Sequence, residues 1–314
     1  MSGIFDARLF QPPLTFMGVD YGHDLAGRGA AVLGIPFDVG AHPSRVGARE
    51  GPRAIREASR LIRRFRPPDA DFDPVERLRL VDCGDVRLTP SLLEEAEAAI
   101  EKAVGLIAGT GAVPVTMGGD GSVTLAQLRA VAARHPGLVV LHVDSHTDAN
   151  AGEGRAAATG TTFTRAAKEG LVDTGASLHL GMRGTFRAAG TFDFARSLGY
   201  GVMTYDDLRR RGVEAVAADL RGRLAGRPVY LCWDMDFFDP SCAPGVCAPI
   251  PGGPGAEEGL RLLRGLAGLN LVACDINTVS PPHDPQGITA LLAAQVMYDC
   301  LVLICQGRQQ TQAV

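Results

Sequence analysis

Three potential metal ligands stand at alternate positions in the segment LHVDSHTDAN: Asp144, His146 and Asp148. Further carboxylates follow two similar apolar runs, in the segments VTMGGDGSVT and LCWDMDFFDP: Asp120, Asp234, Asp236 and Asp239. Carboxylates a few ångströms apart repel by several kcal/mol per pair at an effective dielectric constant of about 20. Such a cluster must hold protons or cations. Oxygen ligands with one imidazole suit Mn²⁺, Ni²⁺, Co²⁺ or Zn²⁺, so these residues predict a metal centre.

The elements that must position these residues are short apolar runs separated by helix-like segments. The runs cover residues 30–35, 79–82, 113–117, 138–143, 177–181, 201–205, 228–233 and 271–275. Each is apolar nearly throughout, which is typical of strands covered on both faces. Helical patterns lie between them, for example at 91–109 and 257–269. The alternation predicts an α/β fold, a three-layer α/β/α sandwich with a mainly parallel sheet.

The acidic segments all follow strand-like runs. In an open parallel sheet, ligands bind outside the carboxyl ends of the strands, so the three segments are expected to meet there. No low-complexity linker or internal repeat divides the chain, and residues 1–314 are expected to form one domain. The Pro/Gly-rich stretch at 239–255 is long enough to be a functional loop.

Composition excludes several classes of function. The net charge is −4 and there is no basic block, so a nucleic-acid partner is not expected. The apolar stretch at 288–305 is interrupted by Gln295, Tyr298 and Asp299, which favours a buried helix over a membrane span. No signal peptide is visible, and the seven cysteines form no zinc pattern. Together these features predict a cytoplasmic protein with reduced thiols. The sequence has no dinucleotide-binding motif and no nucleophile relay, so a dinucleotide enzyme and covalent hydrolysis are not expected.

Seven segments in order carry a resemblance to a known family: residues 34–59 (GIPFDVGAHPSRVGAREGPRAIREAS), 118–124 (GGDGSVT), 142–148 (HVDSHTD), 160–173 (GTTFTRAAKEGLVD), 181–184 (GMRG), 233–253 (WDMDFFDPSCAPGVCAPIPGG) and 280–299 (SPPHDPQGITALLAAQVMYD). On these segments the chain resembles the ureohydrolase family, which includes arginase, agmatinase and guanidino-acid hydrolases. The resemblance implies an arginase-like α/β/α fold around an eight-stranded parallel sheet, usually assembled as a trimer or hexamer.

The resemblance also implies a two-metal centre that hydrolyses a guanidinium group to urea and an amine. Family members generally bind manganese and in some cases nickel. By resemblance, one metal position here takes Asp144, His146, Asp234 and Asp236. The second position keeps only the carboxylates Asp144, Asp148 and Asp234. Zinc is a further candidate for the retained ligands.

Three family site positions are substituted. Gly121 stands where the family usually has a metal-ligating His after Gly-Gly-Asp. Thr159 stands where related enzymes often have a His near the substrate. Thr278 stands where they have a Glu that pairs with the substrate guanidinium, and losing such a carboxylate typically costs several kcal/mol. We interpret these changes as specific loss of independent guanidine chemistry.

The leading hypothesis is therefore a subunit with a degenerate two-metal site and little activity alone. It would partner a catalytic ureohydrolase paralogue, as in mixed assemblies that hydrolyse biguanides such as metformin to urea or a guanylurea-type product and an amine. A surface that evolved for self-pairing can also pair with a close relative. The alternative is a self-sufficient hydrolase with one or two metal ions that acts on a non-standard guanidino or amide substrate.

A third hypothesis is that another histidine completes a two-metal site. His23, His42 and His283 are the candidates, although each is more simply explained as a loop-packing or surface residue. His142 is expected to face the other side of the sheet from Asp144 and to be a core residue that makes one hydrogen bond.

Overall fold

The computed structural model describes residues 13–38, 42, 44–89, 91–152 and 158–312. Eight strands form one sheet in which every pairing is parallel. They are β1 (Ala30–Gly34), β2 (Val81–Asp85), β3 (Val113–Met117), β4 (Val139–Val143), β5 (Leu178–Met182), β6 (Gly201–Thr204), β7 (Val229–Asp234) and β8 (Leu271–Asn277). All eight apolar runs are therefore strands, within about three residues of the predicted ends.

The helices lie between and after these strands. They are α1 (Gly51–Ser59), α2 (Pro74–Leu78), α3 (Leu93–Ala108), α4 (Thr124–Ala132), α5 (Thr162–Lys168), α6 (Thr191–Ser197), α7 (Tyr205–Arg211), α8 (Val213–Leu224), α9 (Ala256–Arg264) and α10 (Ile288–Gln312). The two helical patterns taken from the sequence correspond to α3 and α9.

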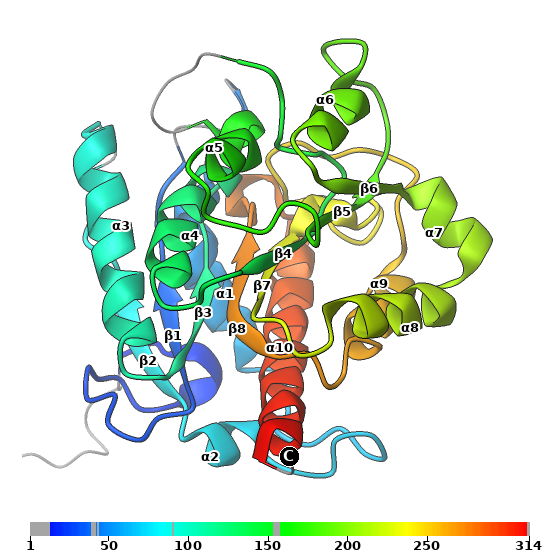
Figure 1. The fold of residues 1–314 in the computed structure, drawn as a ribbon. Coiled ribbons are helices and arrows are strands. Elements are labelled where there is room, and N and C mark those ends of the chain that lie inside the picture. Colours follow the sequence, from blue (N-terminus) through cyan, green and yellow to red (C-terminus); the bar gives the residue numbers. More distant parts are fainter. Residues whose placement is uncertain (1–12, 39–41, 43, 90, 153–157, 313–314) are drawn as a thin grey trace, which may run out of the picture.

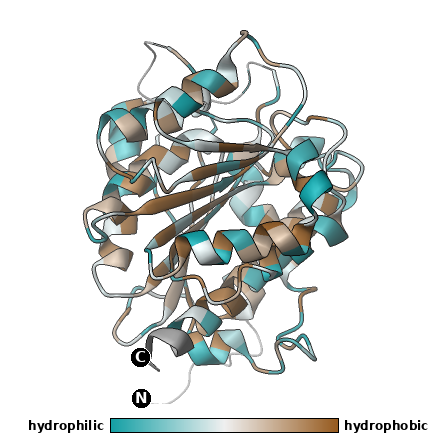
Figure 2. Ribbon diagram, turned by 45° about the vertical axis from the view of Figure 1, so that its right-hand side comes forward, coloured by the Kyte–Doolittle hydropathy of each residue, from teal (hydrophilic) through white to brown (hydrophobic). Residues whose placement is uncertain are grey.

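The helices cover both faces of the sheet, which confirms the α/β/α sandwich (Figure 1). One buried cluster joins strand side chains to α1, α2 and α7 to α10, and the other joins the alternate strand side chains to α3, α4, α5 and α6. Leu141, for example, lies in the first cluster and Val140 in the second. This two-residue alternation puts apolar groups into both interfaces, and the strands are accordingly the most hydrophobic part of the ribbon (Figure 2).

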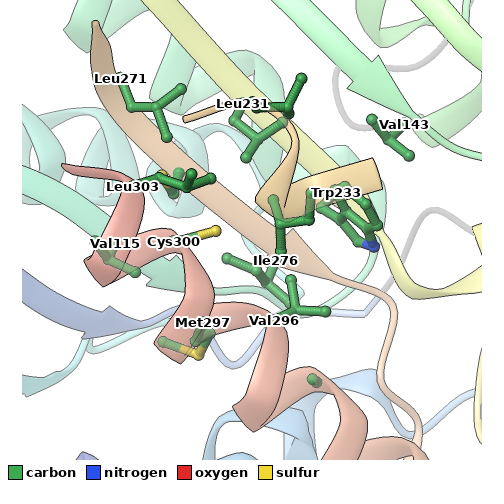
Figure 3. Packing of buried hydrophobic residues seen from close by; sticks show 14 of the residues in the cluster. Val115, Val143, Leu231, Trp233, Leu271, Ile276, Val296, Met297, Cys300 and Leu303 are labelled. Atoms are coloured by element: carbon green, nitrogen blue, oxygen red, sulfur yellow. The ribbon is translucent and has the colours of Figure 1, made fainter. Parts of the chain in front are cut away.

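The helix α10 is the apolar stretch that the sequence marked as a buried helix. Its side chains Val296, Met297, Cys300 and Leu303 pack near Ile276 and Trp233 of the central strands (Figure 3). In the described part of the chain, only Pro285–Arg308 is long and apolar enough to cross a membrane, and 83% of its most apolar 18-residue stretch is buried inside the fold. That degree of burial is typical of the core helix of a folded domain.

The strand order decides where the functional segments meet. It runs β2-β1-β3-β8-β7-β4-β5-β6, so β3, β8, β7 and β4 are consecutive neighbours. Because all four are parallel, their carboxyl ends lie on one edge. The segments that contain Asp120, Thr278, Asp234 and Asp144 are therefore brought together although they are far apart in the chain.

Candidate metal centre

The first group of ligands consists of Asp144, His146 and Asp236, which we name the first cluster. The Nδ1 atom of His146 lies 3.3 Å from Asp144 Oδ1 and 3.1 Å from Asp236 Oδ2. Ser145 supports this arrangement, because its hydroxyl donates to Asp236 Oδ1 at 2.7 Å and its amide donates to the same oxygen at 3.1 Å. The backbone amide of His146 donates to Asp144 Oδ1 at 2.5 Å. The ligand atoms of all three side chains lie within 4.8 Å of one another.

The second group, which we name the second cluster, consists of His142, Asp144 and Asp148. Its ligand atoms also lie within 4.8 Å of one another, and all three residues are buried. His142 Nε2 is 2.9 Å from Asp144 Oδ2. That approach lacks the direction of a hydrogen bond, so Asp144 Oδ2 accepts none although it is buried. Asp144 therefore contributes one oxygen to each cluster.

The structure places His142 in the core with a hydrogen bond, as expected, but the expectation that it faces the other side of the sheet from Asp144 was wrong. Side chains two residues apart on a strand point to the same face, so His142 and Asp144 share the face covered by α5. The ring of His142 packs on Phe163 of that helix, with 4.3 Å between ring centroids. Its Nδ1 lies 2.9 Å from Nδ1 of His179, the neighbouring residue on β5. The sequence analysis missed His179, although its position in a strand beside β4 was predicted.

The three histidines that were candidates to complete a two-metal site lie elsewhere. His23 bonds the carbonyl of Cys83 at 3.1 Å, and His283 bonds the hydroxyl of Ser280 at 2.9 Å. His42 accepts hydrogen bonds from the amides of Ser44 and Arg45. None of the three belongs to either ligand cluster of the described residues.

Asp234 belongs to neither three-residue cluster, and its carboxylate accepts hydrogen bonds from neighbouring groups. Its Oδ1 accepts from the amide of Asp236 at 2.7 Å and from the hydroxyl of Thr278. Thr278 has a φ of 68° and Asp148 a φ of 46°, a region that is uncommon for non-glycine residues and unusual for a β-branched one. Such backbone strain concentrates at functional sites, and here it falls on two residues of the acidic cluster.

Gly121 and Thr159 are in contact. A Cβ atom on Gly121 would lie 2.8 Å from Thr159 Cγ2 and 3.4 Å from Asp148 Oδ2. A side chain at position 121 would thus point at the acidic cluster, in the direction that Thr159 partly fills. The hydroxyl Oγ1 of Thr159 is buried and has no hydrogen-bond partner. Gly121, Thr159 and Thr278, the positions that the resemblance marks as substituted, therefore lie beside one set of carboxylates.

Asp120 is positioned by the loop that follows β3. Its Oδ1 accepts hydrogen bonds from the amide of Ser122 at 3.0 Å and from the hydroxyl of the same residue at 2.5 Å. The loop fits only because residue 119 is glycine, since a Cβ there would lie 1.5 Å from the carbonyl oxygen of Phe37. Asp120 is fully buried, and its charge acts on Asp148.

Three further residues that sequence reasoning passed over support the site. Ser145 orients Asp236, as described above. Arg183, just after β5, donates to the carbonyls of Asp236, Phe237, Phe238 and Ile250. Cys247, from the Pro/Gly-rich loop, donates to the carbonyl of Thr278 at 3.7 Å. Burial, followed by the charge of Asp120, raises the pKa of the Cys247 thiol, so it stays protonated.

The electrostatics of the carboxylates is asymmetric. Burial alone would raise the pKa of Asp144, but the neighbouring imidazoles of His142 and His146 outweigh it and hold that pKa well below its usual range. Burial and the charge of Asp144 raise the pKa of Asp148 well above its usual range. Burial and the charges of Asp236 and Asp144 do the same for Asp234. The cluster therefore has one firm anion and several carboxyl groups that ionise readily only beside a cation.

The model of the arginase family matches residues 28–303 of the chain. The chain belongs to the arginase family. It is 37% identical over 276 residues to a guanidinobutyrase of Pseudomonas aeruginosa, covering 88% of this chain and 86% of that one. It is 35% identical to a mitochondrial guanidino acid hydrolase of Homo sapiens, covering 88% of this chain and 78% of that one.

The fold agrees with solved arginase-family structures. The structure of proclavaminate amidinohydrolase from Streptomyces clavuligerus superimposes with a TM-score of 0.88 at 36% identity, covering 96% of this chain and 99% of that one. The eight-stranded parallel sheet of this chain is thus the arginase-like fold that the resemblance implied.

The described residues fit a divalent cation. The site combines buried carboxylates, two imidazoles and a buried carboxylate oxygen, Asp144 Oδ2, that accepts no hydrogen bond. Nitrogen and oxygen donors of this kind suit nickel, manganese or zinc. The first cluster offers one imidazole and two carboxylates, with Asp234 beside it.

Proposed function

We propose that this chain is a ureohydrolase subunit with one well-formed metal position, and that it hydrolyses guanidino compounds only together with an intact paralogue. The metal is nickel or manganese, with zinc as a further candidate. In this proposal the chain is a single domain in a trimeric or hexameric assembly, and it is located in the cytoplasm. The substrate class is a guanidine or biguanide of the metformin type, cleaved at a carbon–nitrogen bond.

One observation carries this proposal: the three substituted positions meet at the acidic cluster. Gly121 and Thr159 are in contact beside Asp148, and Thr278 donates a hydrogen bond to Asp234. Changes scattered over the surface would not affect one reaction. Three changes around one cluster remove an imidazole ligand, a second imidazole and a carboxylate from the same pocket.

Each remaining residue has a defined task. Asp144, His146, Asp234 and Asp236 would hold a cation, which lowers the pKa of water and polarises the substrate. Thr278 offers a hydroxyl where a guanidinium cation needs a negative partner, and its hydrogen already goes to Asp234. Thr159 offers a hydroxyl in place of a base. The chain's own residues are therefore better suited to holding a cation than to binding and cleaving a guanidinium.

The test is to purify the full chain alone and together with an intact ureohydrolase homologue from the same organism. Release of urea, guanylurea and amine from guanidino compounds and metformin is then measured at equal protein concentration. We expect the chain alone to be slower than the mixed assembly by at least about 100-fold, the order of loss for a missing catalytic group. Rapid turnover by the homogeneous chain would refute the proposal.

A second candidate function is hydrolysis of a neutral amide with one metal ion. The hydroxyls of Thr159 and Thr278 favour it, because they make the pocket less negative than a guanidinium site. Amidase activity of the chain alone, lost on His146→Ala, would support this candidate over a partner-dependent subunit.

A further inference from the structure

A cavity of about 410 Å³ opens at the edge of the sheet opposite the candidate metal centre. Its walls come from the first residues of β3 and β8, from the ends of α3 and α4, and from the C-terminal half of α10. Because β3 and β8 are parallel to the other strands, their amino ends lie away from the edge where the acidic cluster meets. The volume is within the range of small-molecule pockets, roughly 300–1,000 Å³.

The floor of this cavity is apolar. It is formed by side chains that belong to the core and are each no more than 8% exposed: Ala112, Val113, Leu271, Val272 and Ile304. A short aliphatic group that covers such a floor leaves water, and each buried methylene group favours binding.

The rim of the cavity carries positive charge from Arg134, after α4, and Arg308, in α10. The Nη2 atom of Arg308 donates to the carbonyl of Gly111 at 2.8 Å. The Nη2 atom of Arg134 lies 3.3 Å from the position that a Cβ atom would take on Gly109. Both guanidinium groups therefore lie against the same turn after α3, although their residues are far apart in the chain.

The other polar side chains at the cavity are the imidazole of His135 and the amide of Asn270. None of the described residues that line the cavity has a carboxylate. A cation near the end of a helix is favourable by itself, which gives each arginine a role beside α3. That role requires neither a cavity nor a second guanidinium. Two guanidinium forks at one turn, above an apolar floor, are instead typical of a site that recognises a carboxylate or a phosphate.

We propose that this cavity binds a small organic acid, with an oxyanion head group on a short apolar body. Arg134 and Arg308 would hold the head group, and the apolar floor would hold the body. The cavity shares no lining residue with the candidate metal centre, so the inference does not rest on the proposed function.

The test is equilibrium dialysis of the full chain against labelled butyrate, butyl phosphate and butyramide, which share an apolar body and differ in the head group. It is carried out on zinc-loaded and on chelator-treated protein. We expect one butyrate or butyl phosphate per chain, bound at least about 10-fold more tightly than butyramide, because hydrogen bonds to ionised groups are roughly twice as strong as neutral ones. The affinity should be the same with and without zinc, whereas an anion bound at the metal centre would be lost with the metal.

The ring of His135 reports where the anion binds. Burial lowers the pKa of His135, and an anion in the cavity should raise that pKa again. Ring nitrogen shifts of the ¹⁵N-labelled histidines, followed over pH with and without butyrate, measure this change. The signals of His142 and His146 should not move with butyrate in chelator-treated protein.

Arg134→Gln and Arg308→Gln should each weaken butyrate binding by about 10-fold and leave butyramide binding unchanged. The matched control is Arg221→Gln, because Arg221 is exposed and donates to the carbonyl of Gly265 outside the cavity. It should bind butyrate as the wild type does, and the thermal midpoint shows that each variant is folded.

Equal affinity for butyrate and butyramide, binding of butyrate only to zinc-loaded protein, or unchanged butyrate binding in both arginine variants of the cavity would overturn the proposal. The head-group comparison and the His135 shifts use the wild-type chain, so they decide the question even if a variant does not fold. Each of these outcomes leaves the dependence of guanidine hydrolysis on a partner chain as it was.

Discussion

At the scale of single residues, Gly121 and Thr159 act as a pair. The backbone at Gly121 lies outside the left-handed region, so a larger residue is allowed there by conformation. A larger residue is excluded by lack of space, because the Thr159 methyl group lies 2.8 Å from the position that its Cβ atom would take. Introducing a histidine at position 121 therefore requires a change at position 159 as well.

We expect Gly121→His alone to destabilise the protein by about 1–3 kcal/mol, the usual effect of overpacking a buried site. Gly121→His with Thr159→Ser removes the obstructing methyl group and should recover most of that loss. Urea denaturation of both variants measures the difference, and zinc content shows whether the new imidazole binds. Equal stability of the single and double variants would contradict the steric account.

Arg183 is a second residue whose importance lies in its geometry. Its guanidinium donates to four backbone carbonyls, of residues 236, 237, 238 and 250. It therefore holds the turn that carries Asp236 against the Pro/Gly-rich loop. Lysine keeps the charge but has one nitrogen and no fork of donors.

Arg183→Lys should lower the unfolding free energy by about 1–3 kcal/mol, because buried carbonyls are left unpaired. It should also weaken cation binding at the first cluster, since the turn with Asp236 loosens. Isothermal titration with Zn²⁺ measures the affinity. Arg196→Lys, an exposed arginine on α6, is the matched control and should leave both quantities unchanged.

At the scale of elements, the central strands are tied to α4 by a buried carboxyl group beneath the metal centre. Asp275 on β8 accepts hydrogen bonds from Thr124 at 2.6 Å and Tyr230 at 3.2 Å, and Thr116 approaches at 3.3 Å. These partners belong to α4, β7 and β3. The group therefore fixes the start of α4 relative to the strands whose ends form the site.

Burial raises the pKa of Asp275, although hydrogen bonds from Thr124 and its other neighbours oppose the shift. A carboxyl group with a raised folded pKa gives its full stability below the ordinary pKa of aspartate, near 4, and loses it as pH rises through the shifted value. Asp275→Asn removes this titration. We expect the wild type to lose stability relative to the variant as pH rises from about 4, measured by urea unfolding at several pH values. A pH-independent difference would contradict this assignment.

At the scale of the whole molecule, the candidate metal centre lies where four parallel strands end, so a bound cation would act on the core of the fold. Several buried carboxyl groups there have raised pKa values, chiefly through burial and their mutual repulsion. A bound divalent ion removes that repulsion. Protons compete with the ion for the same oxygens.

Removing metal with a chelator should therefore lower the thermal midpoint, and readdition of Ni²⁺ should restore it. At a free ion concentration 100 times the dissociation constant, the gain is about 2.7 kcal/mol per site. The gain should be larger at pH 8 than at pH 5.5, because ionised carboxylates bind the ion without releasing protons. Scanning calorimetry at both pH values measures this, and an equal gain at the two values would contradict it.

The sequence by itself determined the strands, the α/β/α layers and most of the cluster. Apolar runs mark buried strands because each residue on them faces a covered surface. Aspartates just beyond such runs mark the ligand edge, and Asp144, His146 and Asp236 do lie together there. These inferences rest on patterns of apolar and acidic residues within about ten consecutive positions, and the burial of a strand is enough to explain such patterns.

Only the tertiary structure decided which distant side chains touch. His142 and His179 are neighbours because β4 pairs with β5, and Gly121 meets Thr159 because the loops after β3 and β4 fold over one edge. The strand order that places β8 and β7 between β3 and β4 is a global property of the packed sheet. The face of His142 was open to prediction from the two-residue period of a strand. Its partner was not, since no local pattern specifies which residue of another strand lies beside it.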